Sequence, residues 1–240
     1  MVIIDYWLQI VGVCLGSYLL GSIPFGKIVS KYGKGVDIQK VGSGNIGGTN
    51  VGRTLGFRYG ALVGGLDAWK GALPVILTMY FLGQNWWLAG IAWLFAFLGH
   101  LFPFWLKFKG GKGVSVFVGG LLALTGWKTC LIILACWIIV FLFLVRRKMS
   151  AANLIITAGL LMFILMIPIF LYITPIILIM IGLIWWAHRE NIRRIIKGEE
   201  PSIKLPSVFD RLPDDILRWS IDKLQSLINK LQNLQNQKKS

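Results

Sequence analysis

The sequence predicts an all-α protein that crosses a membrane about seven times. Hydrophobic residues make up 56% of the 240 positions, and the mean hydropathy is +0.69. Several uncharged runs are long enough to cross a bilayer, which takes about 20 residues. Four clusters rich in Gly, Asn, Ser, Lys, Arg and His interrupt these runs, at 42–53, 108–113, 146–150 and 188–194. Glycine-rich backbone together with positive charge indicates anion binding at a membrane surface.

The expected spans are deduced from the apolar runs and the charges between them. The fourth run is short for a crossing, but without it the basic cluster at 146–148 would lie opposite that at 107–112. Short basic loops tend to stay cytoplasmic, so we expect this run to cross. The uncharged stretch 151–187 must then cross twice, turning near Pro168. The predicted spans are roughly 4–30, 59–82, 86–106, 113–127, 128–145, 151–168 and 169–187.

The distribution of charge sets the expected orientation. With the N-terminus outside and the C-terminus cytoplasmic, Lys128 is the only basic residue beyond the membrane and Lys70 the only one well within it. No basic region precedes the first apolar run, so we expect it to be retained rather than cleaved. The net charge of +15 is spread over loops between spans. This pattern argues against nucleic acid as a partner and favours contact with membrane lipid.

Two regions are expected. Residues 1–200 form the membrane-embedded domain, and residues 201–240 form a cytoplasmic extension. Three prolines punctuate its first part, after which apolar residues recur at spacings of four and three over 214–235. That spacing predicts an amphipathic helix. The helix could lie on the membrane surface or pair with a partner helix, and the sequence leaves both readings open.

The first polar cluster lies in a long glycine-rich loop, 31–59. Glycines free the backbone to curl, while Ser43, Asn45 and Asn50 supply neutral polar groups and Arg53 a planar cationic fork suited to phosphate. A glycine-rich connector with incidental polar residues is the alternative. Several donors beside an arginine favour an anion site.

The second cluster, KGGKG, immediately precedes the fourth apolar run. A helix beginning there would add exposed N–H groups and the positive end of its dipole to the lysine charges. The spacing does not fit a Walker A loop, so nucleotide hydrolysis has little support. A basic membrane anchor with a glycine turn is the alternative. The candidate phosphate-binding residues are Lys109, Gly110, Gly111, Lys112 and Gly113.

Three further features carry titratable groups. Asp67 and Lys70 are three residues apart inside the second span, where ionisable residues are usually functional, although a self-neutralising pair is the alternative. His188 ends the last span with Asn191 and Arg193 about one helical turn away, a combination able to carry a proton and hold an anion. Asp67 could orient a histidine.

Metal and cofactor sites are not expected. The cysteines at 14, 130 and 136 all fall in apolar runs, without the spacing of metal ligands or of a disulfide framework. The two histidines, His100 and His188, have no Cys/His cluster around them. We therefore expect no metal and no cofactor.

Five motifs follow one another along the chain: GSIPFG at 21–26, GSGNIGGTNVGR at 42–53, LDAWKG at 66–71, GHLFP with KFKGGKG at 99–113, and HRENIRRIIKGEE at 188–200. In order and approximate spacing they resemble those of the bacterial acyl-phosphate:glycerol-3-phosphate acyltransferases, which are small integral membrane enzymes. The resemblance covers about residues 5–200 and departs from the usual pattern at GGTN, where GATN is more usual, and at Asn153, where a second serine is common.

The resemblance implies a step of phospholipid biosynthesis at the cell inner membrane. A fatty acyl group moves from long-chain acyl phosphate to the sn-1 hydroxyl of glycerol 3-phosphate, giving lysophosphatidate and inorganic phosphate on the cytoplasmic side. The resemblance also ties Ser43 and Arg53 to activity, the KGGKG region to substrate phosphate, and His188 with Asn191 to the third family motif. The acyl phosphate already carries a good leaving group, so the protein need mainly position substrates, stabilise charge and manage one proton.

We hypothesise catalytic roles for His188, Ser43 and Asp67, with His188 as general base oriented by Asp67. In a rival mechanism the departing phosphate takes the proton and His188 only binds. Substrate binding is assigned to Ser150 and Asn191 at the acyl-phosphate end and to Asn45, Asn50, Arg53, Lys109, Gly110, Gly111, Lys112, Gly113 and Arg193.

Two other functions stay open from the sequence. An acyl-CoA donor is disfavoured because the His-x4-Asp signature of the acyl-CoA-dependent glycerolipid acyltransferases is absent: Trp105 follows His100 at that spacing, and Arg193 follows His188. A transporter of a phosphorylated solute would use Asp67 and Lys70 to line a path. However, a path needs polar residues at both ends, whereas nearly all polar groups are expected on one side.

Overall fold

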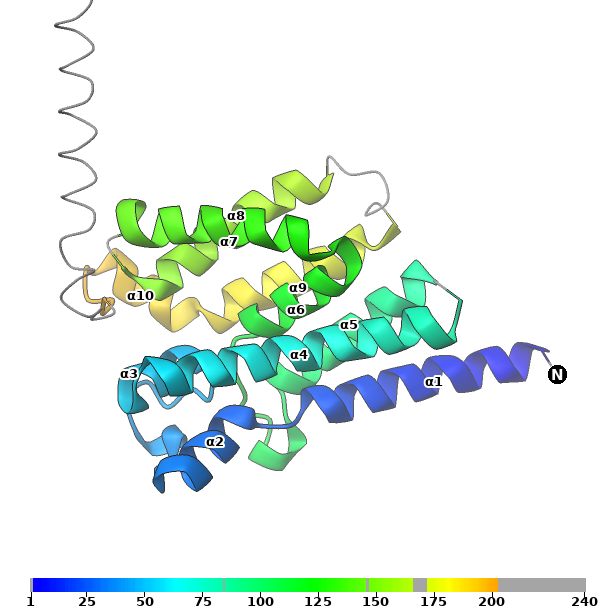
Figure 1. Ribbon diagram of the computed structural model, residues 1–240, viewed down its shortest axis with the longest axis horizontal. Coiled ribbons are helices and arrows are strands. Elements are labelled where there is room, and N and C mark those ends of the chain that lie inside the picture. The colour runs from blue at the N-terminus through cyan, green and yellow to red at the C-terminus, as the bar shows by residue number, and fades with distance from the viewer. Residues whose placement is uncertain (1, 84, 146, 166–171, 203–240) are drawn as a thin grey trace, which may run out of the picture.

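The computed structural model describes residues 2–83, 85–145, 147–165 and 172–202, and the regular structure in these ranges is entirely helical (Figure 1). The apolar helices run roughly side by side, while short polar helices collect at the end of the molecule opposite the N-terminus. The apolar helices are α1 (Val2–Gly21), α4 (Phe57–Phe81), α5 (Trp86–Leu101), α6 (Val114–Thr125), α7 (Trp127–Ile139), α8 (Met149–Leu165) and α9 (Thr174–Ala187). The short polar helices are α2 (Phe25–Lys34), α3 (Gly48–Leu55) and α10 (Arg189–Ile196).

The all-helical membrane fold expected from the sequence is confirmed. Within the described ranges, four segments are long and apolar enough to cross a bilayer: 6–34, 57–81, 86–106 and 127–144. The helices α6, α8 and α9 are apolar but shorter. The count of seven crossings and the orientation of the N-terminus stay predictions.

The first predicted span, 4–30, is not one helix. It breaks after Gly21 and resumes at Phe25, because Pro24 lacks an N–H and disfavours helical geometry in the residue before it. The carbonyl freed at Ile23 accepts a hydrogen bond of 2.8 Å from Nζ of Lys70, which reaches it from α4. The amphipathic α2 therefore leaves the line of α1 and joins the polar end.

The glycine-rich stretch 31–59 is more ordered than the long loop expected. It contains a 3₁₀ turn, η1 (Ile38–Lys40), which Asp37 caps by accepting from Gln39 N at 3.3 Å, and the helix α3. The α3 backbone packs directly on α4: a Cβ at Gly60 would lie 2.6 Å from Cα of Gly52. Part of the glycine content thus serves close helix packing rather than loop flexibility.

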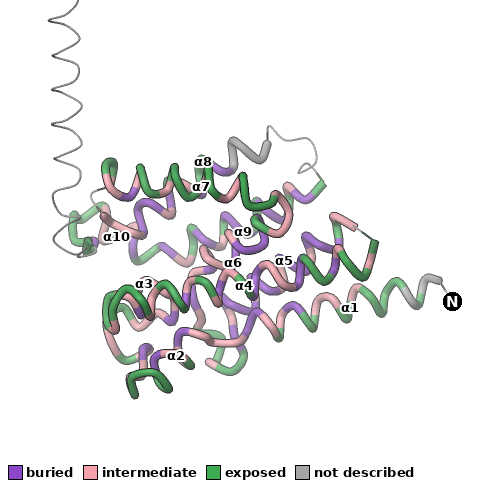
Figure 2. Tube along the Cα trace, viewed as in Figure 1, coloured by how far each residue is buried: buried purple, intermediate pink, exposed green. Residues whose placement is uncertain are grey.

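The core lies between α5, α6 and α9. Trp93 and Phe117 are fully buried with ring centroids 5.0 Å apart, and the Trp93 indole donates to the carbonyl of Val116 at 3.3 Å. Apolar side chains also cover the outside, most clearly on α7, where Leu131 and Ile132 are exposed (Figure 2). An apolar exterior of this kind suits contact with lipid.

The polar end is completed by two turns. The 3₁₀ turn η2 (Phe104–Leu106) follows α5, and a π-helical turn, η3 (Val140–Leu144), ends the α7 segment just before the 146–150 cluster. The predicted amphipathic helix at 214–235 lies outside the described residues.

Candidate active site at the polar end

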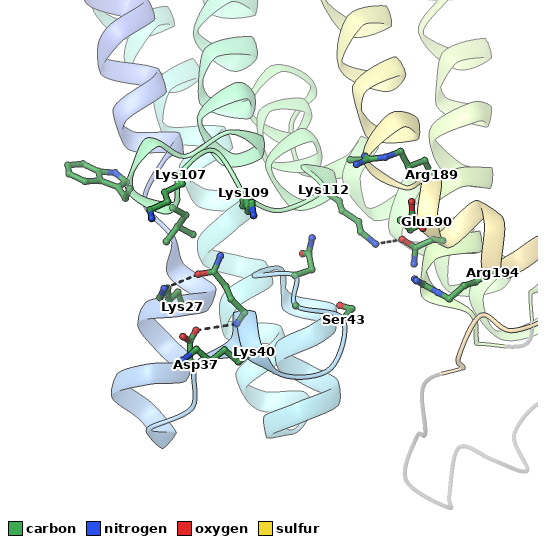
Figure 3. Close-up of a pocket in the computed structure, with 18 residues that line it drawn as sticks. Lys27, Asp37, Lys40, Ser43, Lys107, Lys109, Lys112, Arg189, Glu190 and Arg194 are labelled. Carbon is green, nitrogen blue, oxygen red and sulfur yellow. Dashed lines mark hydrogen bonds between the residues drawn. The ribbon is translucent and has the colours of Figure 1, made fainter.

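A cavity of about 670 Å³ opens at the polar end, where segments far apart in the sequence meet (Figure 3). Its walls come from α2, the η1 turn and the loop after it, the η2 turn, the 107–112 segment and the start of α10. Seven cationic side chains line it against two carboxylates, so it suits anions. The cationic residues are Lys27, Lys40, Lys107, Lys109, Lys112, Arg189 and Arg194, and the acidic ones are Asp37 and Glu190.

The glycine-rich loop contributes Ser43 and Asn45 to the cavity wall. Its third polar residue, Asn50, is 2% exposed and braces the loop instead. The Asn50 amide donates to three backbone carbonyls at 3.0–3.2 Å, and its oxygen accepts from Ser43 N at 2.9 Å. The substrate contact predicted for Asn50 stays a prediction; in this structure both ends of its side chain are used to hold Ser43 and Asn45 in place.

The KGGKG turn lies against the end of α5. Gly110 N donates to the carbonyl of Leu101 at 3.1 Å and Gly111 N to that of His100 at 3.0 Å, so these two N–H groups are not directed at an anion. Gly110 lines the cavity, whereas Gly111 and Gly113 do not. The glycines thus shape the turn rather than bind through N–H groups. Gly113, at a φ of 83°, is the N-cap of α6 and aims the helix into the bundle.

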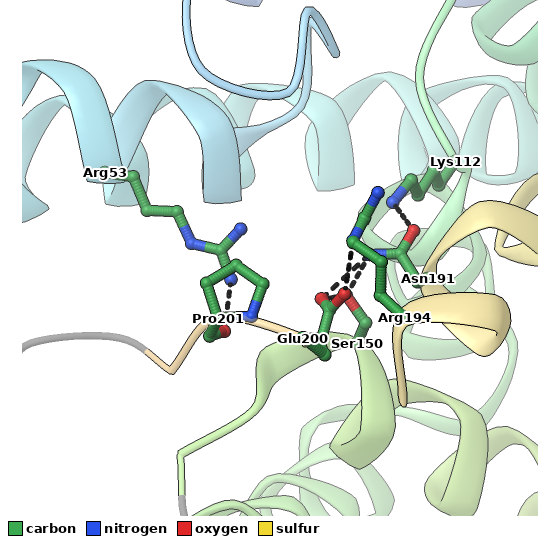
Figure 4. A network of polar contacts seen from close by, with 7 residues as sticks. All are labelled: Arg53, Lys112, Ser150, Asn191, Arg194, Glu200 and Pro201. Atoms are coloured by element: carbon green, nitrogen blue, oxygen red, sulfur yellow. Dashed lines mark hydrogen bonds and ion pairs between the residues drawn. The ribbon is translucent and has the colours of Figure 1, made fainter. Parts of the chain in front are cut away.

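Lys112 is the one residue of this turn that joins a network of hydrogen bonds formed by Ser150, Asn191, Arg194 and Glu200 (Figure 4). Its ammonium donates to Oδ1 of Asn191. Burial lowers the pKa of Lys112 to about 8, with the charges of Arg194 and Arg53 acting in the same direction and Glu200 opposing them. Because Lys112 lines the cavity, its charge is available to a bound phosphate.

The network continues from Asn191 through a buried carboxylate, that of Glu200 (Figure 4). Asn191 Nδ2 donates to Ser150 Oγ at 2.7 Å and to Glu200 Oε1 at 2.9 Å, and Ser150 Oγ donates to Glu200 Oε1 at 2.7 Å. Arg194 Nε donates to the other carboxylate oxygen at 2.9 Å. Burial alone would raise the pKa of Glu200, but these hydrogen bonds and the Arg194 charge outweigh it and hold that pKa below its usual value.

Arg53 and Arg193 are positioned differently from each other. Arg53 donates to the carbonyl of Pro201 at 3.0 Å, and burial lowers its pKa, so it lies against the same segment as Glu200. The side chain of Arg193 is 71% exposed, pairs with Glu190 at 2.8 Å and does not line the cavity. The anion contact predicted for Arg193 stays a prediction, without support from its position in this structure. Arg194, the next residue along α10, faces the site instead because α10 turns that side inward.

His188 is 2% exposed, at the junction of α9 and α10. Its Nδ1 lies 2.8 Å from the carbonyl of Ile184, which can only accept, so Nδ1 carries the proton and Nε2 keeps its lone pair. Burial, followed by the Lys112 charge, lowers the pKa of His188 to about 4. The imidazole is therefore neutral around pH 7 and able to accept one hydrogen bond.

Asp67 does not make the predicted contact with His188. Its carboxylate lies inside the bundle, 3.0 Å from Nζ of Lys70 and 3.6 Å from Nδ1 of His100. His188 receives its orientation from its own helix, through the Ile184 carbonyl. The self-neutralising pair, weighed as the alternative, describes Asp67 and Lys70 better than direct catalysis does.

Sequence reasoning missed several cavity residues. Lys27 donates to Gln39 at 2.8 Å, which links α2 to η1 at the wall, and neither residue lies in a polar cluster singled out above. The amphipathic pattern of α2 was hidden because its residues were read as the end of a span. Glu200 is the last residue of the HRENIRRIIKGEE motif, but only the folded chain reveals that it returns to Ser150. Within the described ranges, no three His, Cys, Asp or Glu side chains form a candidate metal site.

Comparisons with known proteins identify the family of this chain. The family model described as glycerol-3-phosphate acyltransferase matches residues 11–198. A glycerol-3-phosphate acyltransferase of Bartonella henselae is 43% identical over 190 residues, covering 78% of this chain and 88% of that protein. One from Aquifex aeolicus is 38% identical over 184 residues, covering 77% and 94%.

Solved structures give the same answer. The crystal structure of PlsY (YgiH), an integral membrane glycerol 3-phosphate acyltransferase, in its glycerol 3-phosphate form superimposes with a TM-score of 0.75 at 35% identity. The superposition covers 81% of this chain and 96% of the PlsY chain. The lysophosphatidic acid form of PlsY superimposes with a TM-score of 0.74. The chain therefore belongs to the glycerol-3-phosphate acyltransferase family and is an integral membrane enzyme of that family.

Proposed function

We propose that this enzyme transfers a fatty acyl group from acyl phosphate to the sn-1 hydroxyl of glycerol 3-phosphate. The hydroxyl oxygen bonds to the acyl carbon, the bond from that carbon to the phosphate oxygen breaks, and the hydroxyl proton leaves with inorganic phosphate. The product is lysophosphatidate. Support comes from the family motifs and from the two PlsY crystal forms, which hold glycerol 3-phosphate and lysophosphatidic acid.

The observation that carries the proposal is the excess of cations around one cavity at the end of an apolar bundle. Its volume of about 670 Å³ lies within the ≈ 300–1,000 Å³ typical of small-molecule sites. A reaction between a phosphorylated soluble substrate and a phosphorylated lipid needs two anion positions next to hydrocarbon. This cavity has enough positive charge for both.

Four of the seven cations lie on opposite walls, two on each (Figure 3). Lys112 and Arg194 lie beside the Ser150–Asn191–Glu200 network, while Lys27 and Lys40 lie on the α2 and η1 side together with Ser43. One phosphate at each group would bring the glycerol hydroxyl and the acyl carbon between them. Arg53 then acts indirectly: its hydrogen bond to the Pro201 carbonyl holds the 199–202 segment against the network.

The low pKa of His188 bears on how the proton moves. A base with a pKa of about 4 takes a proton less readily than a phosphate ester group, whose second pKa is about 6. The rival mechanism considered above, in which the departing phosphate takes the proton, therefore suits the site better than general base catalysis. His188 is buried just behind the cavity lining, between Ala187 and Arg189, so a glycerol hydroxyl that reaches past this lining would donate to Nε2 and be oriented by it.

The membrane location is part of the proposal. The basic loops are expected to stay on the cytoplasmic side, so the cavity would open to the cytoplasm at the inner membrane, where glycerol 3-phosphate is available. Residues 1–200 would form the catalytic domain, and residues 201–240 would continue from the site as a cytoplasmic extension.

The donor is tested by offering purified protein palmitoyl phosphate or palmitoyl-CoA with glycerol 3-phosphate. Lysophosphatidate and inorganic phosphate in equal amounts from palmitoyl phosphate alone are the expected result. Product from palmitoyl-CoA at a comparable rate would overturn the donor assignment.

The role of His188 is tested with His188→Ala. Loss of an orienting hydrogen bond should appear mostly in KM, whereas loss of a general base should lower kcat by about 10²–10⁴-fold. A large kcat effect with unchanged KM would restore the general base.

A further inference from the structure

The buried polar cluster of Asp67, Lys70 and His100 is left without a part in the reaction described above. All three residues are at most 3% exposed, and they lie between the helices α4 and α5 inside the bundle. Ionisable residues at such positions are costly, and their presence in a membrane protein indicates a function. The contacts of His100 suggest what that function is.

His100 lies between Asp67 and the KGGKG turn. One ring nitrogen, Nδ1, is 3.6 Å from the Asp67 carboxylate. On the other side, a Cβ built on Gly111 would lie only 2.0 Å from Nε2 and 2.5 Å from Cε1 of the same ring. The His100 backbone also accepts from Gly111 N at 3.0 Å. The imidazole edge is therefore the surface against which the Gly111 backbone rests.

Lys112 follows directly in the chain. Its ammonium reaches the cavity and the Asn191 side chain, so a small rotation of the turn at Gly111 would be carried to the Lys112 charge at the end of its long side chain. We propose that His100, packed beside Asp67 with a buried Nδ1 that has no hydrogen-bond partner, is a positioning residue that fixes the KGGKG turn and thereby sets where Lys112 meets the substrate phosphate. This inference rests on the proposed phosphate-binding role of Lys112.

Lys70 extends the same arrangement to a second wall of the cavity. Its ammonium contacts Asp67 at 3.0 Å and donates to the carbonyl of Ile23 at 2.8 Å, in the break between α1 and α2. The helix α2 carries Lys27 into the cavity. Asp67 thus pairs with Lys70, which reaches one wall, and lies beside His100, which supports the turn on the opposite wall.

The test is a double-mutant cycle between the two contacting positions. Gly111→Ala inserts a methyl group where the His100 ring lies, whereas His100→Asn removes Nε2 and Cε1 but keeps a polar atom near Asp67. Gly182→Ala on α9 is the matched control, since a Cβ there meets no atom within 4 Å. Each variant is assayed for KM and kcat, and for the rise in melting temperature caused by glycerol 3-phosphate, which reports binding without turnover.

Gly111→Ala should lower kcat/KM on the order of 100-fold, mainly through KM, since displacement of a binding group by about 1 Å has effects of this size. The double variant should recover at least tenfold relative to Gly111→Ala, because the asparagine leaves room for the methyl group. The control should match the wild-type protein. The glycerol 3-phosphate shift should follow the same order.

Two results would overturn the inference. One is a double variant whose loss equals the product of the two single losses, since independent sites show no recovery. The other is a set of variants that melt at lower temperature while KM and the ligand shift stay unchanged, which would indicate a purely structural contact. A wild-type protein that binds glycerol 3-phosphate but does not use acyl phosphate would count against the donor assignment alone.

Discussion

Alkaline pH should weaken phosphate binding by removing the charge of Lys112. Burial lowers the pKa of this residue to about 8, so its ammonium is present below that pH and is lost as the pH rises through it. With a pKa near 8, the charged fraction falls about 90-fold between pH 7 and pH 10. If the charge binds the substrate phosphate, kcat/KM for glycerol 3-phosphate should decline by a similar factor.

The assay is the initial rate of lysophosphatidate formation from pH 5 to 10, with a blank without enzyme for spontaneous hydrolysis of the acyl phosphate. The kcat/KM profile reports the free enzyme and free substrate, so the alkaline limb should lie near pH 8. The kcat profile should bend at higher pH, because a bound phosphate dianion stabilises the ammonium.

Lys112→Arg is the informative variant. A guanidinium keeps its charge throughout this range, so the variant should lose the limb near pH 8 even though its absolute rate falls through altered geometry. An alkaline limb that stays near pH 8 in Lys112→Arg would refute the reasoning, since the titrating group would then be another one. Gly182→Ala, on the outer surface of α9, serves as the unperturbed reference.

Three further predictions concern the supports of the site. Asn50→Ala should destabilise the protein by about 3 kcal/mol, seen as a lower melting temperature, because four buried or partly buried hydrogen bonds are lost. An unchanged melting temperature would contradict the bracing role. Glu200 has a lowered pKa, so its stabilising effect is present above the ordinary pKa of glutamate and lost as the pH falls through the lower folded value. Glu200→Gln should therefore melt with less pH dependence between pH 6 and 3 than the wild-type protein, and equal dependence would exclude this role. Gly21→Ala should disrupt the contact of α1 with the α5 backbone, 2.0 Å from the added Cβ, whereas Gly12→Ala, with no atom within 4 Å, should be neutral; equal effects would rule out that contact.

Much of the architecture was predictable because hydrophobicity and charge act over long windows. The runs 59–82 and 86–106 correspond closely to α4 and to α5 with η2, since a bilayer demands about 20 apolar residues whatever their neighbours are. The basic clusters were expected on one side, and they do gather at one end of the bundle (Figure 1). The break at Pro24 was missed because residues 25–30 continue the apolar run without a charge cluster.

The site was only partly predictable, because its residues meet through contacts that no sequence window contains. Ser43, Lys112 and Asn191 were singled out, and all three line the cavity. Two polar residues of the same clusters, Asn50 and Arg193, turned out to brace a loop or face solvent. Residue type identified groups able to bind phosphate, but the direction of each side chain depends on packing between segments up to about 150 positions apart.

The unequal lengths of α4 and α6 explain why a phosphate site can lie next to hydrocarbon. Gly71 of α4 packs against Val116 of α6 so closely that a Cβ would lie 2.1 Å from the Val116 carbonyl, and Gly64 lies beside Ser115. From Gly64 back to its start at Phe57, α4 continues for about 10 Å by helical rise. The KGGKG turn is therefore recessed below the end of its neighbour.

That recess has an electrostatic consequence. A lysine at the rim of the bundle would be fully hydrated, whereas Lys112 starts from the recessed turn and loses part of its hydration, which is the main cause of its lowered pKa. Partial dehydration strengthens the attraction between its ammonium and a phosphate, because the effective dielectric constant is lower there than in water. The glycines of KGGKG are then required for a mechanical reason as well: only a backbone without side chains can pass between the end of α5 and the start of α6 at this depth.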